Sequence, residues 1–333
     1  MSDAAPATTF ALAAAASLGA SWLLVVRLER VGERLGLSEA LLGMVAALAA
    51  DAPEITTAVT AVVHHQRSVG AGVVMGSNVF NLAALLGLGA AVAGRIDLHR
   101  KVVVLGGAVA LWMAGITVLS VTRAMTPVVG LVLAATALAL YLAVLGAKRW
   151  PLPTRLLATS PVRWLRTAVD EEEMELVVAI RPVRGNARDV GLAAAATAGV
   201  VVASVVMERS ASTLGSRHDI PGIVLGGLLL AVVTSLPNAV AAVYLAARGR
   251  GAAALSTALN SNTINVVAGL LLPGAILGIG ASTAPVVLVA AWYGGLTTLT
   301  LVLAHARRGL GRGTGAVILA AYVAFVAALL AVA

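Results

Sequence analysis

Long runs of apolar residues, separated by short polar stretches, fill almost the whole chain. Most of the runs are roughly 20 residues long, which is the length that an α-helix needs to cross the hydrocarbon core of a bilayer. We therefore predict ten membrane-spanning helices, five on either side of the longest polar stretch. Their approximate ranges are 10–26, 39–63, 69–93, 102–121, 127–147, 190–206, 220–247, 252–279, 285–304 and 315–333.

The longest polar stretch divides the chain into three parts. Residues 1–147 form the first predicted five-helix repeat, residues 148–188 a loop, and residues 189–333 the second repeat. Within the loop, a basic and partly amphipathic segment at 155–166 is expected to lie on the membrane surface. The acidic run 170–175 is expected to be solvated; a regulatory cation site there is disfavoured, because consecutive acids point around a helix instead of converging.

Composition excludes a soluble protein. Hydrophobic residues make up 60% of the 333 residues, charged residues make up 11%, and the mean hydropathy is +0.97. These values are typical of an all-α polytopic membrane protein embedded in a lipid bilayer. The chain contains no cysteine, so disulfides, thiolate metal sites and cysteine nucleophiles are excluded.

The net charge of +8 reflects the distribution of basic residues among the loops. The loops that follow the odd-numbered helices hold 19 of the 23 Lys and Arg residues. Basic loops remain in the cytoplasm during insertion, so we expect these loops, including 148–188, in the cytoplasm and both termini outside the plasma membrane. The basic surplus indicates topology and gives no reason to expect a nucleic-acid partner.

One part of the first half recurs in the second half. A single offset of 184 positions maps Pro53 onto Pro237 and carries one group of three polar residues onto another. The two groups are Ser77, Asn78 and Asn81, and Ser261, Asn262 and Asn265. Since each half has an odd number of helices, the two copies enter the membrane in opposite directions. Inverted repeats with interrupted helices in matching places are typical of secondary transporters, whose substrate site lies near the bilayer midplane.

The residues around the first of these prolines predict a cation site. Pro53 lacks an N–H group and its ring clashes with the carbonyl four residues earlier, so the second helix should break and free carbonyls near Ala49 and Ala50. Its counterpart should break the seventh helix in the same way. Asp51 and Glu54 lie three residues apart, on one face of a helical turn. Carboxylates and carbonyls are ligands of hard cations, and two carboxylates match the charge of one divalent ion.

The cost of burial separates these acids from ordinary surface acids. One ionisable side chain at the membrane centre costs about 3 kcal/mol or more, so a purely structural role is a poor explanation for two neighbours. The repeated serines and asparagines, taken singly, would be ordinary interhelical hydrogen-bond partners. Their recurrence with the same one-turn spacing favours a shared polar site.

These motifs resemble the two alpha-repeats of the cation/calcium exchanger superfamily, typified by sodium/calcium exchangers. The matching sequences are Pro-Glu at 53–54 and Gly-Ser-Asn-x-Phe-Asn at 76–81, repeated as Thr-Ser-Leu-Pro at 234–237 and Ser-Asn-x-x-Asn at 261–265. The resemblance implies alternating-access antiport of calcium against sodium or another cation, with no cofactor besides the transported ions. The cation ligands that it implies are Glu54, Ser77, Asn81, Thr234, Ser235, Ser261 and Asn265. Asn78 and Asn262 would instead brace the packing.

Three positions depart from the residues that are usual in this family. Asn238 stands where the second Pro-Glu motif would have its glutamate, Asp51 replaces a serine, and Asn265 occupies a position that is often acidic. The site keeps a charge near minus two, but both acids now belong to the second helix. We therefore add Asp51 and Asn238 to the expected cation-binding residues and keep calcium, sodium and protons as candidates for the exchanged ions.

Three functions agree with these residues, and a secondary cation antiporter is favoured. A channel-like uniporter would need no second ion, but it should show a repeated pore signature, and none is visible. A diverged family member that binds ions without transporting them is the third, because Asn238 replaces a signature acid. An enzyme is not expected, since Asp51 and Glu54 have no membrane-embedded His, Lys or Cys nearby to complete a catalytic set.

The charge pattern predicts the orientation of the chain in the membrane, and cysteine labelling can test it. Because the chain has no cysteine of its own, a single introduced cysteine is the only site that reacts. A single cysteine introduced as Asp3→Cys should react with a membrane-impermeant reagent added outside intact cells, and Arg100→Cys should react only after permeabilisation. Labelling of position 3 from the cytoplasmic side alone would contradict the assignment.

Overall fold

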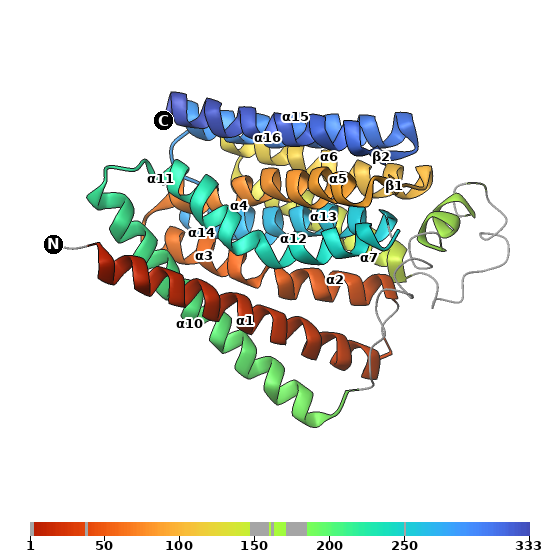
Figure 1. Cartoon of the computed structure of the whole chain (residues 1–333), viewed down its shortest axis with the longest axis horizontal. Helices are drawn as coiled ribbons and strands as arrows, with labels where there is room; N and C mark the ends of the chain where they lie inside the picture. The colour runs from red at the N-terminus through yellow and green to blue at the C-terminus, as the bar shows by residue number, and fades with distance from the viewer. Residues whose placement is uncertain (1–2, 37–38, 147–159, 161–162, 171–184, 250) are drawn as a thin grey trace.

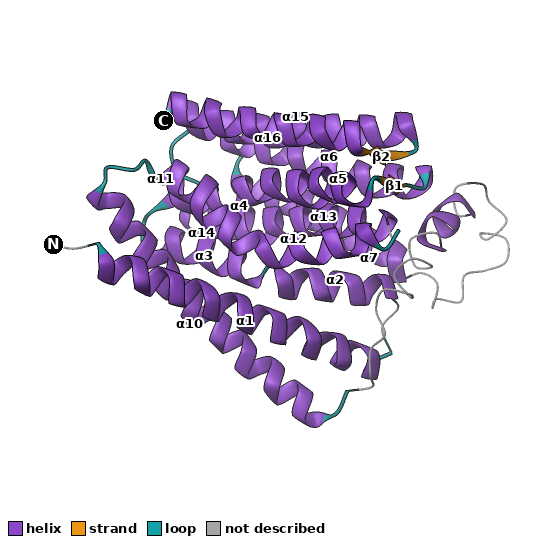
Figure 2. Ribbon diagram, viewed as in Figure 1, coloured by secondary structure: helices purple, strands orange, loops and turns teal. Residues whose placement is uncertain are grey.

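The computed structural model describes residues 3–36, 39–146, 160, 163–170, 185–249 and 251–333. Figure 2 shows that these residues are almost all helical. Nine helices among them are long and apolar enough to cross a membrane, and two shorter helices joined at a bend form a further span. The predicted all-α polytopic architecture is confirmed.

The first half contains five spans. They are α1 (Ala4–Arg34); α2 (Glu39–Ala50) with α3 (Ala52–Val63); α4 (Arg67–Asn81) with the π-helical segment η1 (Leu82–Leu88) and α5 (Gly89–Ala93); α6 (Arg100–Val121); and α7 (Pro127–Gly146). Both α1 and its counterpart in the second half, α10, are longer than predicted, because their polar ends continue the helix past the apolar run.

The second half repeats this order. Its spans are α10 (Ala187–Arg217); α11 (Gly222–Val224) with η3 (Leu225–Leu230) and α12 (Ala231–Ala247); α13 (Gly251–Ile264) with η4 (Asn265–Leu271) and α14 (Leu272–Leu277); α15 (Ala284–Arg307); and α16 (Arg312–Val332). Two short strands, β1 (Arg95–Asp97) and β2 (Gly309–Gly311), pair in antiparallel register with Ile96 opposite Leu310. This pair joins the two halves.

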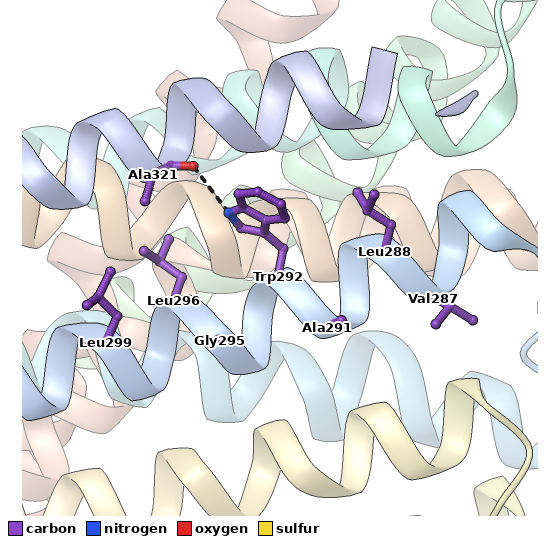
Figure 3. A pocket seen from close by; sticks show the side chains of 8 residues that line it. All are labelled: Val287, Leu288, Ala291, Trp292, Gly295, Leu296, Leu299 and Ala321. Atoms are coloured by element: carbon purple, nitrogen blue, oxygen red, sulfur yellow. Dashed lines mark hydrogen bonds between the residues drawn. The ribbon is translucent and has the colours of Figure 1, made fainter. Parts of the chain in front are cut away.

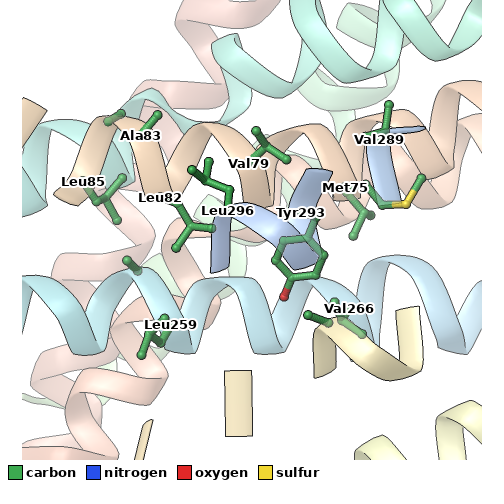
Figure 4. Packing of buried hydrophobic residues seen from close by; sticks show 14 of the residues in the cluster. Met75, Val79, Leu82, Ala83, Leu85, Leu259, Val266, Val289, Tyr293 and Leu296 are labelled. Atoms are coloured by element: carbon green, nitrogen blue, oxygen red, sulfur yellow. The ribbon is translucent and has the colours of Figure 1, made fainter. Parts of the chain in front are cut away.

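The third and eighth spans lie at the centre of the molecule. In Figure 1, α4, α12 and α13 lie between the α15 and α16 helices on one side and α1 with α10 on the other. Met75, Val79 and Leu82 of the third span pack in one buried cluster with Val266 and Tyr293 (Figure 4). Because apolar side chains fill this centre, the polar side chains within it are separated from water and depend on one another.

The α1 and α10 helices pack along each other in opposite directions at one edge of the molecule (Figure 1). At one end of the pair, Arg27 Nη1 lies 2.9 Å from Asp189 Oδ1. At the other end, Asp3 accepts hydrogen bonds from Arg217 at 3.2 Å and from His218 at 2.9 Å. These two bonds, the one from Arg217 above all, lower the pKa of Asp3. The two helices are thus joined by ion pairs at both ends.

The second span breaks where its proline predicts. The α2 and α3 helices meet at Asp51 with a bend of 51°. Pro53 is the second residue of α3, where a missing N–H breaks no hydrogen bond within α3 but leaves the Ala49 carbonyl of α2 without its helical partner. Ser21 of α1 donates to the carbonyl of Ala49 at 3.1 Å and lies 3.4 Å from the carbonyl of Ala50. The carbonyls that the proline frees therefore find a partner in the first span.

The break predicted at Pro237 in the seventh span is wrong. Pro237 lies inside α12, which continues from Ala231 to Ala247. A proline removes one backbone hydrogen bond and crowds one carbonyl, and a membrane helix enclosed by its neighbours can tolerate that loss. The irregular backbone of this span lies earlier, in the π-helical segment η3.

Glycines allow the third and seventh spans to touch backbone to backbone. A Cβ atom on Gly76 would clash with the carbonyl oxygen of Gly227, and one on Gly226 would clash with that of Val69. A side chain at either glycine would therefore push the two spans apart. The close crossing brings the polar residues that follow Gly76 up to α12.

Much of the loop predicted at 148–188 lies outside the described residues, including most of the basic segment 155–166 and all of the acidic run except Asp170. Residues 163–170 are helical, and Val169 packs in one cluster with Met44, Tyr141 and Leu145. This short helix therefore contacts the second and fifth spans.

Candidate cation site

Asp51 and Glu54 are completely buried at the bend of the second span, each with 0% of its surface exposed. Asp51 is the residue between α2 and α3, and Glu54 lies in the first turn of α3. A carboxylate in such surroundings needs hydrogen-bond donors or a cation close by. The contacts around these two acids therefore decide what the site can do.

The donors for both acids come from the second half of the chain. Asp51 Oδ1 accepts hydrogen bonds from Asn238 Nδ2 and Ser261 Oγ, each at 2.6 Å. Glu54 Oε1 accepts a hydrogen bond from Ser235 Oγ at 2.7 Å. Asn238 and Ser235 lie on α12, and Ser261 lies on α13. The first half thus supplies the charges and the second half supplies these donors.

Asparagine side chains join the third and eighth spans. Asn81 Nδ2 donates to Ser261 Oγ at 3.0 Å and to Asn262 Oδ1 at 3.1 Å. Asn78 Nδ2 donates to the Asn262 carbonyl at 3.3 Å, and Asn262 Nδ2 returns a bond to the Asn78 carbonyl at 3.1 Å. This reciprocal pair joins residues 184 positions apart, so the two repeats meet at it. These contacts agree with the bracing role expected of Asn78 and Asn262.

The remaining predicted residues are buried near this network. Asn265 Nδ2 lies 3.3 Å from Asn78 Oδ1. Ser77 Oγ lies 3.4 Å from the Ala231 carbonyl of α12, whereas Thr234 Oγ1 donates within its own helix, to the Leu230 carbonyl at 2.9 Å. All the predicted cation-binding residues therefore gather where the second, third, seventh and eighth spans meet, although the hydroxyls of Ser77 and Thr234 hydrogen-bond to backbone instead of to the acids.

Five buried side-chain oxygens in this network have no hydrogen-bond partner among the described residues. They are Asp51 Oδ2, Glu54 Oε2, Asn81 Oδ1, Asn238 Oδ1 and Asn265 Oδ1. Buried acceptors are normally satisfied, so a group of unsatisfied ones needs an explanation. Carboxylate and amide oxygens are the ligands that hard cations prefer, and the donor set therefore fits a cation.

Thr57 is a further candidate ligand that the sequence analysis did not single out. Its side chain is fully buried, and its hydroxyl has no partner among the described residues. It lies one turn beyond Glu54 on α3, so its spacing from that acid could have indicated that the two side chains share one face of the helix. Threonine is frequent in membrane helices, where it usually bonds to its own backbone, and the signal was therefore weak.

A third fully buried acid, Glu208 on α10, lies outside the candidate cation site. Its side chain is fully buried, accepts a hydrogen bond from Ser212 at 2.8 Å and lies 3.3 Å from His64 Nδ1. Arg209 Nη2 lies 3.2 Å from the other ring nitrogen of His64. The His64 ring thus lies between Arg209 and Glu208 and connects the C-terminal end of α3 with α10. The predicted end of the sixth helix at 206 is wrong, because the helix continues through these polar residues.

Two hollows lie away from the buried acids of the second span. One, of about 540 Å³, is lined by the polar residues around Glu208. The other, of about 500 Å³, is apolar and lies along α15, where Trp292 donates to the Ala321 carbonyl at 3.2 Å (Figure 3). Neither is lined by Asp51 or Glu54, in agreement with the complete burial of these acids.

The chain has membrane spans in two halves, and both halves contribute side chains to one buried polar site. This architecture is that of an inverted-repeat membrane protein, the class to which many secondary transporters belong. The chain belongs to the sodium/calcium exchanger protein family, whose family model matches residues 6–149 and 189–331. It is therefore a multi-pass membrane protein of a family that exchanges inorganic cations. No curated protein matches the chain.

Solved structures of the sodium-calcium exchanger NCX_Mj have the same fold. The structure soaked with 2.5 mM Na+ and 10 mM Sr2+ matches with a TM-score of 0.63 at 19% identity, covering 98% of this chain and 99% of that one. The structure soaked with 2.5 mM Na+ and 0.1 mM Ca2+ gives 0.61 at 20% identity and covers 97% of each chain. This likeness confirms the predicted ten helices in two inverted five-helix repeats.

The contacts of Glu208 predict a large effect on stability. Glu208→Ala should lower the free energy of unfolding by about 3 kcal/mol, because removing one member of a buried charged network leaves the others unpaired. The control Asp3→Ala removes an exposed pair with Arg217 and should change stability little. Thermal unfolding of the purified protein in detergent measures both, and equal shifts would contradict the difference that we infer.

Proposed function

We propose that the protein is a secondary antiporter that exchanges calcium, or another hard divalent cation, for sodium or protons by alternating access. The observation that carries this proposal is the group of five unsatisfied acceptor oxygens around two fully buried carboxylates. The family match supports cation exchange in general, and NCX_Mj is described as a sodium-calcium exchanger. In this proposal both termini lie outside the plasma membrane.

The proposed roles follow from the chemistry of the side chains. Asp51 and Glu54 supply the negative charge, and the amide oxygens of Asn81, Asn238 and Asn265 complete the coordination. Hydroxyl oxygens keep lone pairs while they donate a proton, so they can hydrogen-bond to an acid and bind a cation at the same time. The hydroxyls proposed as ligands are those of Ser77, Thr234, Ser235 and Ser261.

Alternating access needs a site that both repeats share and that neither side of the membrane reaches permanently. The carboxylates of the first half are held by donors of the second half, and all of these groups are buried. Relative movement of the two halves would change these contacts and open the site to one side. The bend at Asp51 lies at the point where such a movement would act.

Measurements of calcium flux distinguish the proposed antiporter from the two other candidate functions. A uniporter would admit calcium into reconstituted vesicles without any opposing ion gradient, and an ion-binding protein without transport would bind calcium and show no flux. The proposed antiporter should take up calcium only against an outward gradient of sodium or of protons. Uptake measured under a sodium gradient, a pH gradient and no gradient separates the three.

Neutralising the buried acids tests the site directly. Asp51→Asn and Glu54→Gln, singly or together, should each reduce calcium uptake by about tenfold or more, because removing charge from a low-dielectric site removes much of its attraction for a cation. Asp97→Asn, which changes an exposed acid, should leave uptake unchanged. Uptake by the double variant at the unmodified rate would overturn the assignment, provided that the protein is inserted and folded.

The position of both charges on one helix also has a consequence for protons. Two carboxylates close together in apolar surroundings repel each other, so without a cation one of them should hold a proton, and the pair should titrate jointly. A divalent cation that binds must then displace this proton. With Asn238 and Asn265 in place of acids, few charges are left for several sodium ions.

We therefore expect exchange to depend more on protons, or to need fewer sodium ions, than in typical sodium/calcium exchangers. Between about pH 6 and pH 8, above the ordinary pKa of a carboxyl group, the calcium concentration for half-maximal uptake should fall as pH rises, because fewer protons compete. Asn238→Glu should increase the dependence on sodium, whereas Asn238→Gln, which adds no charge, should not. Full sodium-driven exchange without any response to pH in this range would contradict the idea.

A further inference from the structure

The hydroxyl of Ser21 is the contact between α1 and the backbone that the proline frees. Ser21 is fully buried, and it donates to the Ala49 carbonyl at 3.1 Å with the Ala50 carbonyl 3.4 Å away. Pro53 has no N–H to pair with the Ala49 carbonyl, and an unpaired carbonyl in apolar surroundings is unfavourable. One side chain from another span thus satisfies the backbone just before Asp51.

This contact also bears on the shape of the second span. In an uninterrupted helix these carbonyls would point along the helix toward the residues that follow. At the 51° bend they are accessible to a side chain of α1 instead. The bend in turn places Asp51 against Asn238 and Ser261, and Glu54 against Ser235. A group that stabilises the bend therefore stabilises the arrangement of the two acids.

The α1 helix is held in place independently of this contact. Ser17, one turn before Ser21 and also buried, lies with its hydroxyl 2.9 Å from that of Ser204 on α10. Ion pairs join the same two helices at both ends. Packing along the whole length of α10 holds α1 without the Ser17 hydroxyl, so Ser21 is presented to the second span from a fixed support. Ser17 is therefore a matched residue whose hydroxyl bonds elsewhere.

We propose that Ser21 is a positioning residue of the cation site. By holding the carbonyls of Ala49 and Ala50 it fixes the bend that presents Asp51 and Glu54 to their partners, and it thereby sets the affinity for the transported cation. Ser21 does not bind the cation itself. The inference rests on the proposed function, since it assumes that these two acids bind calcium.

The test compares calcium uptake and direct calcium binding in three variants. Ser21→Ala removes the hydroxyl and should raise the calcium concentration for half-maximal uptake about 3- to 10-fold, the effect of one lost hydrogen bond, while the maximal rate stays near that of the unmodified protein. Ser21→Thr keeps a hydroxyl and should restore most of the affinity. Ser17→Ala removes the matched hydroxyl and should leave the affinity unchanged.

Binding of calcium to the purified proteins, measured by isothermal titration calorimetry, should show the same order. An unchanged or tighter affinity in Ser21→Ala overturns the inference, and so does an equal loss in Ser17→Ala, which would reveal a general packing effect. If Ser21→Ala does not fold, Ser21→Cys, which keeps the volume but donates more weakly, takes its place with the same expectation. An unmodified protein without calcium binding or flux would instead overturn the proposed function, and the inference with it.

Discussion

Two carboxylates buried in the interior of a membrane protein are the constraint on which the rest of the structure depends. Each is unfavourable there unless donors or a cation lie beside it. Asp51 and Glu54 obtain their donors from Asn238, Ser235 and Ser261, all in the other half of the chain. The two halves differ in chemistry for this reason, since one carries the charge and the other the groups that stabilise it.

Bringing those groups together requires the helices at the centre to approach closely. The glycines at the crossing of the third and seventh spans allow backbone contact there, and the reciprocal bonds between Asn78 and Asn262 join the third span to the eighth. Around this centre, apolar side chains exclude water, which strengthens every charge interaction inside. The same packing leaves five acceptor oxygens without a partner among the described residues, and these oxygens are the basis of the proposed cation site.

The features that could be predicted from the sequence are those that depend on a short stretch of chain or on the internal repeat. The number of spans follows from apolar length, the bend at Asp51 from the chemistry of Pro53, and the grouping of the polar residues from the repeat offset. Pro237 shows the limit of such predictions, because neighbouring helices decide whether a proline interrupts a helix. Glu208 lies beyond the apolar run, where hydropathy cannot tell a helix from a loop. The role of Ser21 could not be predicted from the sequence, since its partner is a backbone carbonyl that only the packing of α1 against the second span brings close.

Asn238 shows how the departure from the family pattern changes the site without removing it. Its amide nitrogen donates to Asp51 at 2.6 Å, whereas its amide oxygen has no partner among the described residues. A glutamate there would add a third negative charge, and an ionised one could not donate to Asp51. The amide therefore keeps Asp51 hydrogen-bonded, and its oxygen is one of those that we propose as cation ligands. When both acids are ionised, one divalent ion or two monovalent ions would neutralise the proposed site equally, which sets the scale of any exchange that it would support.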